Sequence, residues 1–425
     1  MPNLTTLSRR DLENRAGELD ARYAEFRVRR LSLDMTRGKP CTEQLDLSLG
    51  LLECNDYRAA DGTDCRNYGV LEGLPEARAL FAEYLDVAPT EIIVAGNSSL
   101  ALMHDAIVQA LLRPVPGGER PWRSSAKVRF LCPSPGYDRH FAICEYLRIE
   151  MIPIAMTGEG PDMDEVERAV ASDENVKGIW CVPRYQNPMG MTFSDAVVER
   201  FAAMKTRAPD FRIFWDNAYA LHHLSDDPDP LADVFDACRE QGHPDRVLIF
   251  GSTSKISFAG AGIGMIAASE SNLRWFREGM SRQTIGHDKM NQLRHVRFYG
   301  DLRGLVAHMK KHAAILKPKF DAVEEVLERE LGDLDVAAWT RPKGGYFVSL
   351  DTPDGCAREV VAMAADAGVR LTPAGATFPY GRDPRDRNVR IAPSVPSVEE
   401  IRQAMEIVAV SIQRVAISRR LGRAA

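Results

Sequence analysis

A single lysine, Lys255, stands between a hydroxyl-rich turn and a glycine-rich stretch in "FGSTSKISFAGAGIGM". The apolar residues before it predict a buried strand, and the glycines after it let the backbone approach another group closely. A lysine that loses its water gives up its proton more readily, and a neutral amine can attack a carbonyl group. A lone lysine at a strand end is more often a solvated surface charge. The context predicts instead that Lys255 bonds to a carbonyl compound.

Five apolar, β-rich stretches each end in a polar turn or in one that contains glycine or proline. They are Glu91–Gly96, Val128–Tyr137, Gly178–Pro188, Arg212–Tyr219 and Val247–Lys255. Helix-like stretches separate them, which is typical of a largely parallel sheet covered by helices. In open α/β sheets the ligand lies beyond the carboxyl ends of the strands. We therefore expect these five turns to meet around one site.

Pyridoxal phosphate (PLP) is the aldehyde whose other groups match the remaining turns. Its pyridine nitrogen needs a carboxylate, and Asp216 ends one stretch. Its phenolic oxygen needs donors, which Tyr219 and Asn187 supply, and Tyr137 offers a ring to stack on the pyridine. Its phosphate needs a helix start and hydroxyl groups. The residues that fit this last demand are Ser98, Ser99 and Ser252.

Each of these residues has an equally good structural explanation when taken alone. Asp216 could cap a helix, Asn187-Pro188 could be a plain turn, and Tyr137 could be a core aromatic. Five successive strand ends that each carry a group the cofactor requires are far harder to explain in that way. The set as a whole predicts a PLP site.

At these residues the chain resembles the fold-type-I PLP-dependent aminotransferases. The resemblance rests on "YGVLEG", "NSSLAL", "PSPGY", "NPMG", "DNAY", "STSK" and "VRIAPS", which occur in the family's order along nearly the whole chain. The stretches "MTRGKPCTEQLDLS" and "TIGHDKMNQLRHVRFYG" further resemble a divergent bacterial aspartate aminotransferase subgroup. The resemblance implies a large PLP-binding domain with a mostly parallel sheet, and a smaller α+β domain.

The resemblance also implies a role for each matching residue. Lys255 would bind the cofactor and carry the substrate proton, and Asp216 would pair with the pyridinium. Arg390 would hold the substrate α-carboxylate, helped by Asn187 and by the backbone at Gly38. The remaining cofactor-binding residues would be Ser98, Ser99, Tyr137, Tyr219 and Ser252.

Tyr68 carries an implication about assembly. In the family this tyrosine reaches the phosphate of the neighbouring subunit, so the match implies a homodimer with shared active sites. One departure concerns the phosphate as well. The family usually has an arginine on the stretch after the lysine, whereas "GAGIG" is about one residue short and has Gly262 at that place.

A dicarboxylate substrate would need a second cation for its distal carboxylate. The candidates are Arg37, Lys39, Lys289 and Arg294, and for each of them a surface or structural ion pair is an equal alternative. We expect transamination of L-aspartate with 2-oxoglutarate, which yields oxaloacetate and L-glutamate. The alternatives are an alanine–glyoxylate type of exchange, a PLP lyase and, from another class, a non-catalytic ligand-sensing regulator.

Composition bounds the remaining possibilities. A chain of 425 residues favours two domains. We expect residues 49–300 to form the large domain that binds PLP, and residues 1–48 to pack with the small domain. Residues 301–425 should form an interdomain helix, interrupted at Pro318, and the small domain. A net charge of −6 without a basic block argues against nucleic acid and membrane partners. The eight scattered cysteines contain no CxxC pair, and no metal site or signal peptide is evident, so we expect a cytoplasmic protein.

Overall fold

The computed structural model describes residues 4–422, and residues 1–3 and 423–425, at the ends of two predicted segments, lie outside the described part. A seven-stranded sheet dominates it, with strand order β2-β8-β7-β6-β5-β3-β4. Its strands are β2 (Ile92–Val94), β3 (Arg129–Ser134), β4 (Glu150–Ala155), β5 (Val176–Cys181), β6 (Arg212–Asp216), β7 (Val247–Ser252) and β8 (Gly264–Ala268). The pairings from β4 through β7 are parallel, and β8 is antiparallel to both of its neighbours. The predicted α/β class with a mostly parallel sheet is confirmed.

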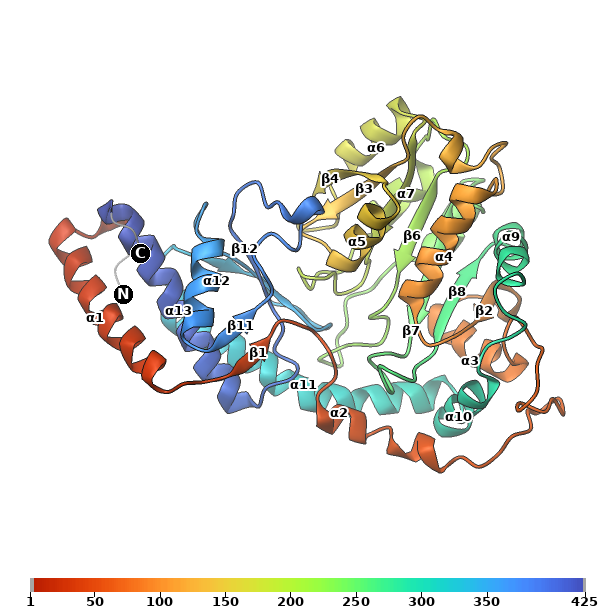
Figure 1. Ribbon diagram of the computed structural model, residues 1–425, viewed down its shortest axis with the longest axis horizontal. Helices are drawn as coiled ribbons and strands as arrows, with labels where there is room; N and C mark the ends of the chain where they lie inside the picture. The colour runs from red at the N-terminus through yellow and green to blue at the C-terminus, as the bar shows by residue number, and fades with distance from the viewer. Residues whose placement is uncertain (1–3, 423–425) are drawn as a thin grey trace.

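Helices cover both faces of this sheet and create two separate cores (Figure 1). One face packs on α4 (Ser99–Leu112), α5 (Asp138–Tyr146) and α9 (Glu270–Met280). The other packs on α3 (Pro75–Leu85), α6 (Met163–Ser172), α7 (Asp195–Ala203), α8 (Val234–Glu240) and α10 (Lys289–Tyr299). Successive strand residues point to opposite faces, so Phe214 enters the first core and Trp215 the second. This is why the strands read as continuous apolar runs.

A third core belongs to the smaller, α+β part of the molecule. A parallel pair joins β1 (Leu33–Met35) to β11 (Val369–Leu371), and an antiparallel sheet has the order β12-β10-β9. The strands of this second sheet are β9 (Ala338–Trp339), β10 (Val348–Asp351) and β12 (Asn388–Ile391). Its helices are α12 (Ala357–Asp366), α13 (Val398–Leu421) and, from the start of the chain, α1 (Arg9–Val28). Figure 1 shows α1 beside α13, which places the N-terminal helix with this part.

One long helix, α11 (Leu302–Leu331), runs from beneath the large sheet to the smaller part (Figure 1). The predicted interruption at Pro318 is wrong, because the helix continues through it. The missing N–H of the proline costs one helical hydrogen bond, while Leu316 and Phe320 on either side are buried and hold the helix in place. The short α2 (Thr42–Asp46) lies against α11. Within residues 4–422, no helix combines the length and the apolar character needed to cross a membrane.

Candidate active site

A cavity of about 200 Å³ opens at the carboxyl ends of the parallel strands. Lys255 follows β7, Asp216 ends β6, and Asn187 follows β5, so neighbouring strands deliver neighbouring side chains. The predicted residues that line this cavity are Ser98, Ser99, Tyr137, Asn187, Asp216, Tyr219, Ser252 and Lys255. Of the predicted cofactor-binding residues, only Tyr68 does not line it.

Lys255 is half-buried in this cavity and is held beside aromatic rings. Its Nζ lies 5.1 Å from the ring centroid of Tyr219. Burial lowers the pKa of Lys255, the Asp216 carboxylate opposes that shift, and Arg390 adds to it. A lowered pKa increases the fraction of neutral amine, which is the nucleophilic and proton-accepting form.

Asp216 lies opposite the lysine, and only one of its two oxygens has a hydrogen-bond partner. Its Oδ2 is 3.0 Å from Nε2 of His140, and both side chains are buried. The His140 ring stacks on Trp180 with centroids 4.3 Å apart. The other oxygen, Oδ1, is buried and has no partner among residues 4–422. A buried carboxylate oxygen without a donor is costly, so the site is built for a ligand that brings an N–H group there.

Two residues of this arrangement, His140 and Trp180, were missed from the sequence. His140 follows Tyr137 by three residues, at the start of α5, so the two side chains share one helix face. Their rings meet edge to face at 4.9 Å, and burial raises the pKa of Tyr137 to about 12. Trp180 carried no usable signal, because an aromatic residue in a buried strand is ordinary core.

The far end of the cavity is formed by the start of α4. Ser98 is the N-cap of this helix, and its hydroxyl accepts a hydrogen bond from the Ala101 N–H at 3.2 Å. Ser252 and Ser254 place their hydroxyl oxygens 2.6 Å apart at the same end. The first N–H groups of a helix and the positive end of its dipole suit a phosphate group. Ser254 lines the cavity too and was missed, although it lies within the quoted "STSK".

Gly262 and Gly264 allow close packing at this end of the cavity. A Cβ on Gly262 would lie 3.0 Å from Thr253 Oγ1 and 3.1 Å from the Ser254 nitrogen, so a larger residue there would have to push the Ser252–Lys255 turn aside. A Cβ on Gly264 would lie 2.7 Å from the Ser98 carbonyl carbon, so this glycine lets β8 pack on the start of α4. Apart from Lys255, no lysine or arginine is among the described residues that line the cavity.

Arg390 lies next to the cavity, on β12 of the smaller part. It is 5% exposed, and its Nη1 donates to Asp138 Oδ1 at 2.9 Å and to Asn187 Oδ1 at 3.3 Å. Its guanidinium also lies over the Phe347 ring. Gly38 packs on the same ring, because a Cβ there would lie 2.5 Å from Phe347 Cζ. Arg390, Asn187 and Gly38, all predicted to bind the substrate carboxylate, are therefore linked through direct contacts.

The other candidates lie away from the cavity lining. Tyr68 is 81% exposed, whereas Lys289 is buried and donates from Nζ to the Gly69 carbonyl at 3.0 Å. Tyr68 thus stands at the surface of the large part, and Lys289 lies buried beneath the next residue, Gly69. Arg37 is exposed, and Arg294 is half-buried with an unpartnered Nε. Lys39, the fourth candidate for the distal carboxylate, is exposed as well.

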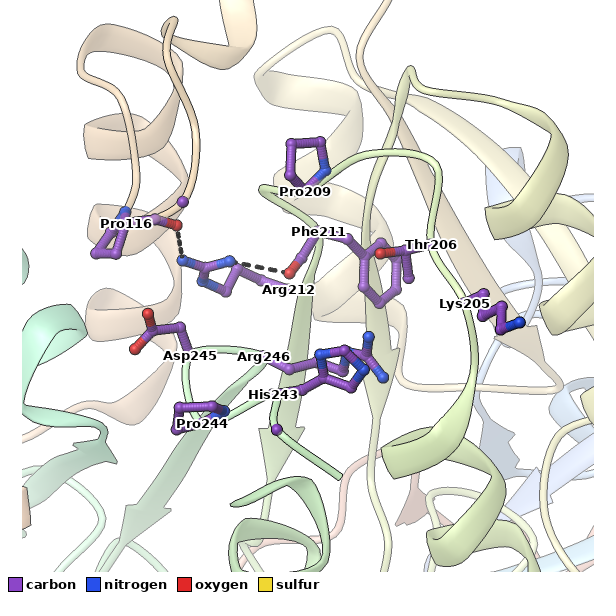
Figure 2. A pocket seen from close by; sticks show the side chains of 12 residues that line it. Pro116, Lys205, Thr206, Pro209, Phe211, Arg212, His243, Pro244, Asp245 and Arg246 are labelled. Carbon is purple, nitrogen blue, oxygen red and sulfur yellow. Dashed lines mark hydrogen bonds between the residues drawn. The ribbon is translucent and has the colours of Figure 1, made fainter. Parts of the chain in front are cut away.

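A larger cavity of about 420 Å³ lies at the opposite, amino-terminal edge of the parallel strands (Figure 2). Figure 2 shows Arg212, at the start of β6, bonded to the carbonyls of Pro116 and Phe211. Burial lowers the pKa of Arg212 to about 10. None of the predicted site residues lines this cavity. We therefore assign the active site to the smaller cavity, because its lining residues carry the required chemical groups.

The fold and this lysine–aspartate cavity together define a fold-type-I, PLP-dependent aminotransferase. The chain belongs to the aspartate amino-transferase family, whose model matches residues 7–424. It is 50% identical over 389 residues to a Mycolicibacterium smegmatis protein whose name gives only the class, aminotransferase. This match covers 90% of this chain and 91% of the other.

Two further relatives carry a more specific name. The chain is 44% identical over 399 residues to the aspartate aminotransferase of Corynebacterium glutamicum, which covers 93% of this chain and 92% of the other. The crystal structure of a C. glutamicum aspartate transaminase superposes with a TM-score of 0.95 at 42% identity, over 98% of this chain and 99% of the other. The protein is therefore an enzyme that transfers an amino group between an amino acid and a 2-oxo acid.

Proposed function

We propose that the enzyme is an aspartate aminotransferase, which converts L-aspartate and 2-oxoglutarate to oxaloacetate and L-glutamate. The names of the two C. glutamicum relatives support this substrate pair. The observation that carries the chemistry is the unpartnered Oδ1 of Asp216, in the same cavity as a lysine of lowered pKa. Asp216 Oδ1 would accept the pyridinium N–H of PLP, and Lys255 would bond to the carbonyl group of PLP.

The residues present fit the cofactor from end to end. When bound, PLP supplies a carbonyl group and an electron-withdrawing ring that makes the substrate α-proton acidic. Asp216 would keep the ring nitrogen protonated, and His140 would orient that carboxylate. The phenolic oxygen would accept from Asn187 and Tyr219, and Tyr137 would cover the ring. The phosphate would be bound by the start of α4 and by the hydroxyls of Ser98, Ser99 and Ser252.

Within this site, Lys255 is the group that moves the substrate proton. Burial lowers the pKa of Lys255, so its Nζ is neutral in a larger fraction of molecules. The neutral amine would take the proton from the substrate α-carbon and deliver it two atoms away, which is a 1,3-transfer. Arg390 would hold the α-carboxylate through a two-pronged ion pair, together with Asn187 and the backbone of Gly38. Asp138 pairs with Arg390 in this structure and would share it with the substrate.

The candidates outside the cavity fit a homodimer with shared active sites. Tyr68 projects from the surface and would enter the partner subunit's cavity at the phosphate. Lys289 is buried beside it, and it would reach the distal carboxylate of the substrate once its Nζ leaves the Gly69 carbonyl. Arg37 is the second candidate for that distal carboxylate. The assignment gives the enzyme a cation for each substrate carboxylate, as a dicarboxylate requires.

The proposed division of labour between domains follows the three cores. Residues 49–300 would bind PLP, and residues 301–425 with the segment 1–48 would contribute Arg390 and Gly38. A cytoplasmic location is supported by the eight cysteines, which are all free thiols.

Spectroscopic titration tests the function directly. The purified protein with PLP should absorb in the visible range, and L-aspartate and L-glutamate should each shift this band while L-alanine hardly does. A band that responds to alanine instead would favour the alanine–glyoxylate type of exchange. A protein that acquires no band from added PLP would disprove the role of Lys255.

A further inference from the structure

The main chain at Lys255 is anchored by side chains from several distant elements. The Lys255 carbonyl accepts a hydrogen bond from Tyr346 Oη at 3.4 Å and lies 3.3 Å from Nε2 of His222. The Lys255 carbonyl is therefore held by side chains from outside its own strand, directly beside the reactive amine.

Gln44 of α2 organises these contacts. Its Oε1 accepts from the Cys41 N–H at 3.2 Å, which fixes the orientation of the amide. Its Nε2 must then donate, and it does so to Tyr346 Oη and to Nδ1 of His312, both at 2.9 Å. Tyr346 accepts this bond and gives its own proton to the Lys255 carbonyl. The main-chain N–H of Cys41 thus determines which group donates and which accepts in each hydrogen bond from Gln44 to Lys255.

The histidines extend the same network into α11. Because Nδ1 of His312 accepts from Gln44, the neutral ring carries its proton on Nε2, which faces Nε2 of His308 at 3.0 Å. Burial lowers the pKa of both rings, that of His312 to about 3. Gln44 and Tyr346 are fully buried and His312 nearly so. A dry network of this kind holds one geometry, because each broken bond leaves a buried polar atom unpaired.

Gln44 lies in the first turn of α2, three residues after the end of segment 36–41, which we call the strap. The strap contains Gly38, and it packs on Tyr346 and Phe347, since a Cβ on Gly38 would lie 2.9 Å from Tyr346 Cβ and 2.5 Å from Phe347 Cζ. The Lys39 carbonyl of the strap also accepts from Ser394 Oγ at 2.7 Å. The backbone proposed to receive the substrate carboxylate and the backbone of Lys255 are therefore joined through one buried chain of hydrogen bonds.

We propose that Gln44 and Tyr346 are positioning residues that tie the placement of the strap to the orientation of Lys255. With the strap packed on Phe347, Gln44 holds Tyr346, and Tyr346 holds the Lys255 carbonyl so that Nζ points at the substrate proton. This inference rests on the proposed role of Lys255. It assigns no contact with the substrate to either residue.

The variant Tyr346→Phe tests the last bond of the chain. We expect kcat with L-aspartate to fall about tenfold, because Lys255 is less often oriented for proton transfer once the bond to its carbonyl is lost. KM should change less than about twofold, since the substrate contacts are retained. The deuterium isotope effect measured with α-deuterated L-aspartate should rise above the wild-type value, because proton transfer by Lys255 becomes slower.

The variant Gln44→Glu tests whether Gln44 must donate a hydrogen bond to Tyr346. Burial raises the pKa of this carboxyl, so the variant is assayed at the alkaline end of the activity range, where the carboxyl is ionised. The carboxylate then accepts from the Cys41 N–H but has no proton to donate, so Tyr346 would turn its hydroxyl toward it and away from Lys255. We expect the same loss of kcat and the same rise in isotope effect. The double variant Gln44→Glu with Tyr346→Phe should be no slower than either single variant, because both remove the same bond.

Tyr23→Phe is the matched control, because Tyr23 is also buried and its hydroxyl lies 2.9 Å from both the Met363 carbonyl and Asp366 Oδ2. It should lower stability and leave kcat and the isotope effect unchanged. PLP content per subunit is measured for each variant, and if Tyr346→Phe does not hold the cofactor, Gln44→Glu carries the test. Wild-type rates for kcat and isotope effect in both variants would overturn this inference alone. A wild-type enzyme that transfers no amino group would overturn the proposed function and this inference together.

Discussion

At the scale of single residues, two buried polar groups in the active site lack a partner that would satisfy them. Asp216 has one oxygen satisfied by His140 and one left unpartnered, and Lys255 has an amine whose charge is disfavoured by burial. Neither condition stabilises the protein by itself. In the proposed function, a pyridinium and a carbonyl group would relieve both, so the cost of leaving these groups unpaired would become specificity for one cofactor.

The substitution Asp216→Asn should separate chemistry from cofactor binding. The amide cannot balance a positive ring nitrogen, so we expect kcat with L-aspartate to fall about a hundredfold to a thousandfold. PLP content should stay near one per subunit, because the phosphate and Lys255 contacts persist. Steady-state kinetics and the visible spectrum measure the two quantities.

Asp210→Asn provides the control for that substitution. Asp210 is as buried as Asp216, precedes the same strand, and accepts from Lys177 Nζ at 2.7 Å, far from the cavity lining. Its variant should lose about 3 kcal/mol of unfolding free energy, as when one partner of a buried pair is removed, and keep its kcat. Equal losses of kcat in the two variants would contradict the assigned role of Asp216.

At the scale of elements, the contact between β8 and α4 shapes the phosphate end of the site. A methyl group on Gly264 would collide with the backbone of Ser98 and Ser99, at 2.7 and 2.8 Å. Gly264→Ala should therefore displace the start of α4 and weaken PLP binding about tenfold or more, since the helix N–H groups lose their geometry. Gly260→Ala, where a Cβ meets nothing within 4 Å, should bind PLP normally. Fluorescence titration of the two apo-enzymes with PLP compares them.

The buried histidines of α10 and α11 predict instability in acid. Burial lowers the pKa of His295, on α10, from 6.5 to about 4. Between those values the unfolded chain binds a proton that the folded chain does not, so the free energy of unfolding falls as pH falls, by about 1.4 kcal/mol per pH unit for this histidine. Urea unfolding of His295→Gln between pH 4.5 and 6.5 should show a slope smaller by that amount. An unchanged slope would contradict the assignment.

The sequence predicted the elements that meet at the cavity but not those that support them. A strand end with a polar turn is a local pattern, and the sheet brings such ends together, so Lys255, Asp216 and Asn187 could be found from spacing. His140, Trp180 and the Gln44 network could not. Their partners are distant in sequence, as for Gln44 and Tyr346, and only the folded structure brings them together. The continuity of α11 through Pro318 was likewise decided by burial on both sides of the proline.

At the scale of the whole molecule, the exposed Tyr68 predicts that a single subunit has an incomplete site. Its ring is 81% exposed and lies beside a buried Lys289, away from the cavity of its own subunit. If each site takes Lys255 from one subunit and Tyr68 from the other, Lys255→Ala and Tyr68→Ala are defective in different halves of the same site. A mixed dimer then holds one intact site and one doubly defective site.

Subunit complementation tests this arrangement. Equal amounts of the Lys255→Ala and Tyr68→Ala proteins, exchanged in mild denaturant and refolded with PLP, should recover about a quarter of wild-type activity, because half of the dimers are mixed and each has one intact site of two. Each variant treated alone should stay at its own low rate. Activity that only averages the two parents would show that Tyr68 acts within its own subunit, and size-exclusion chromatography of the mixture would show whether a dimer forms at all.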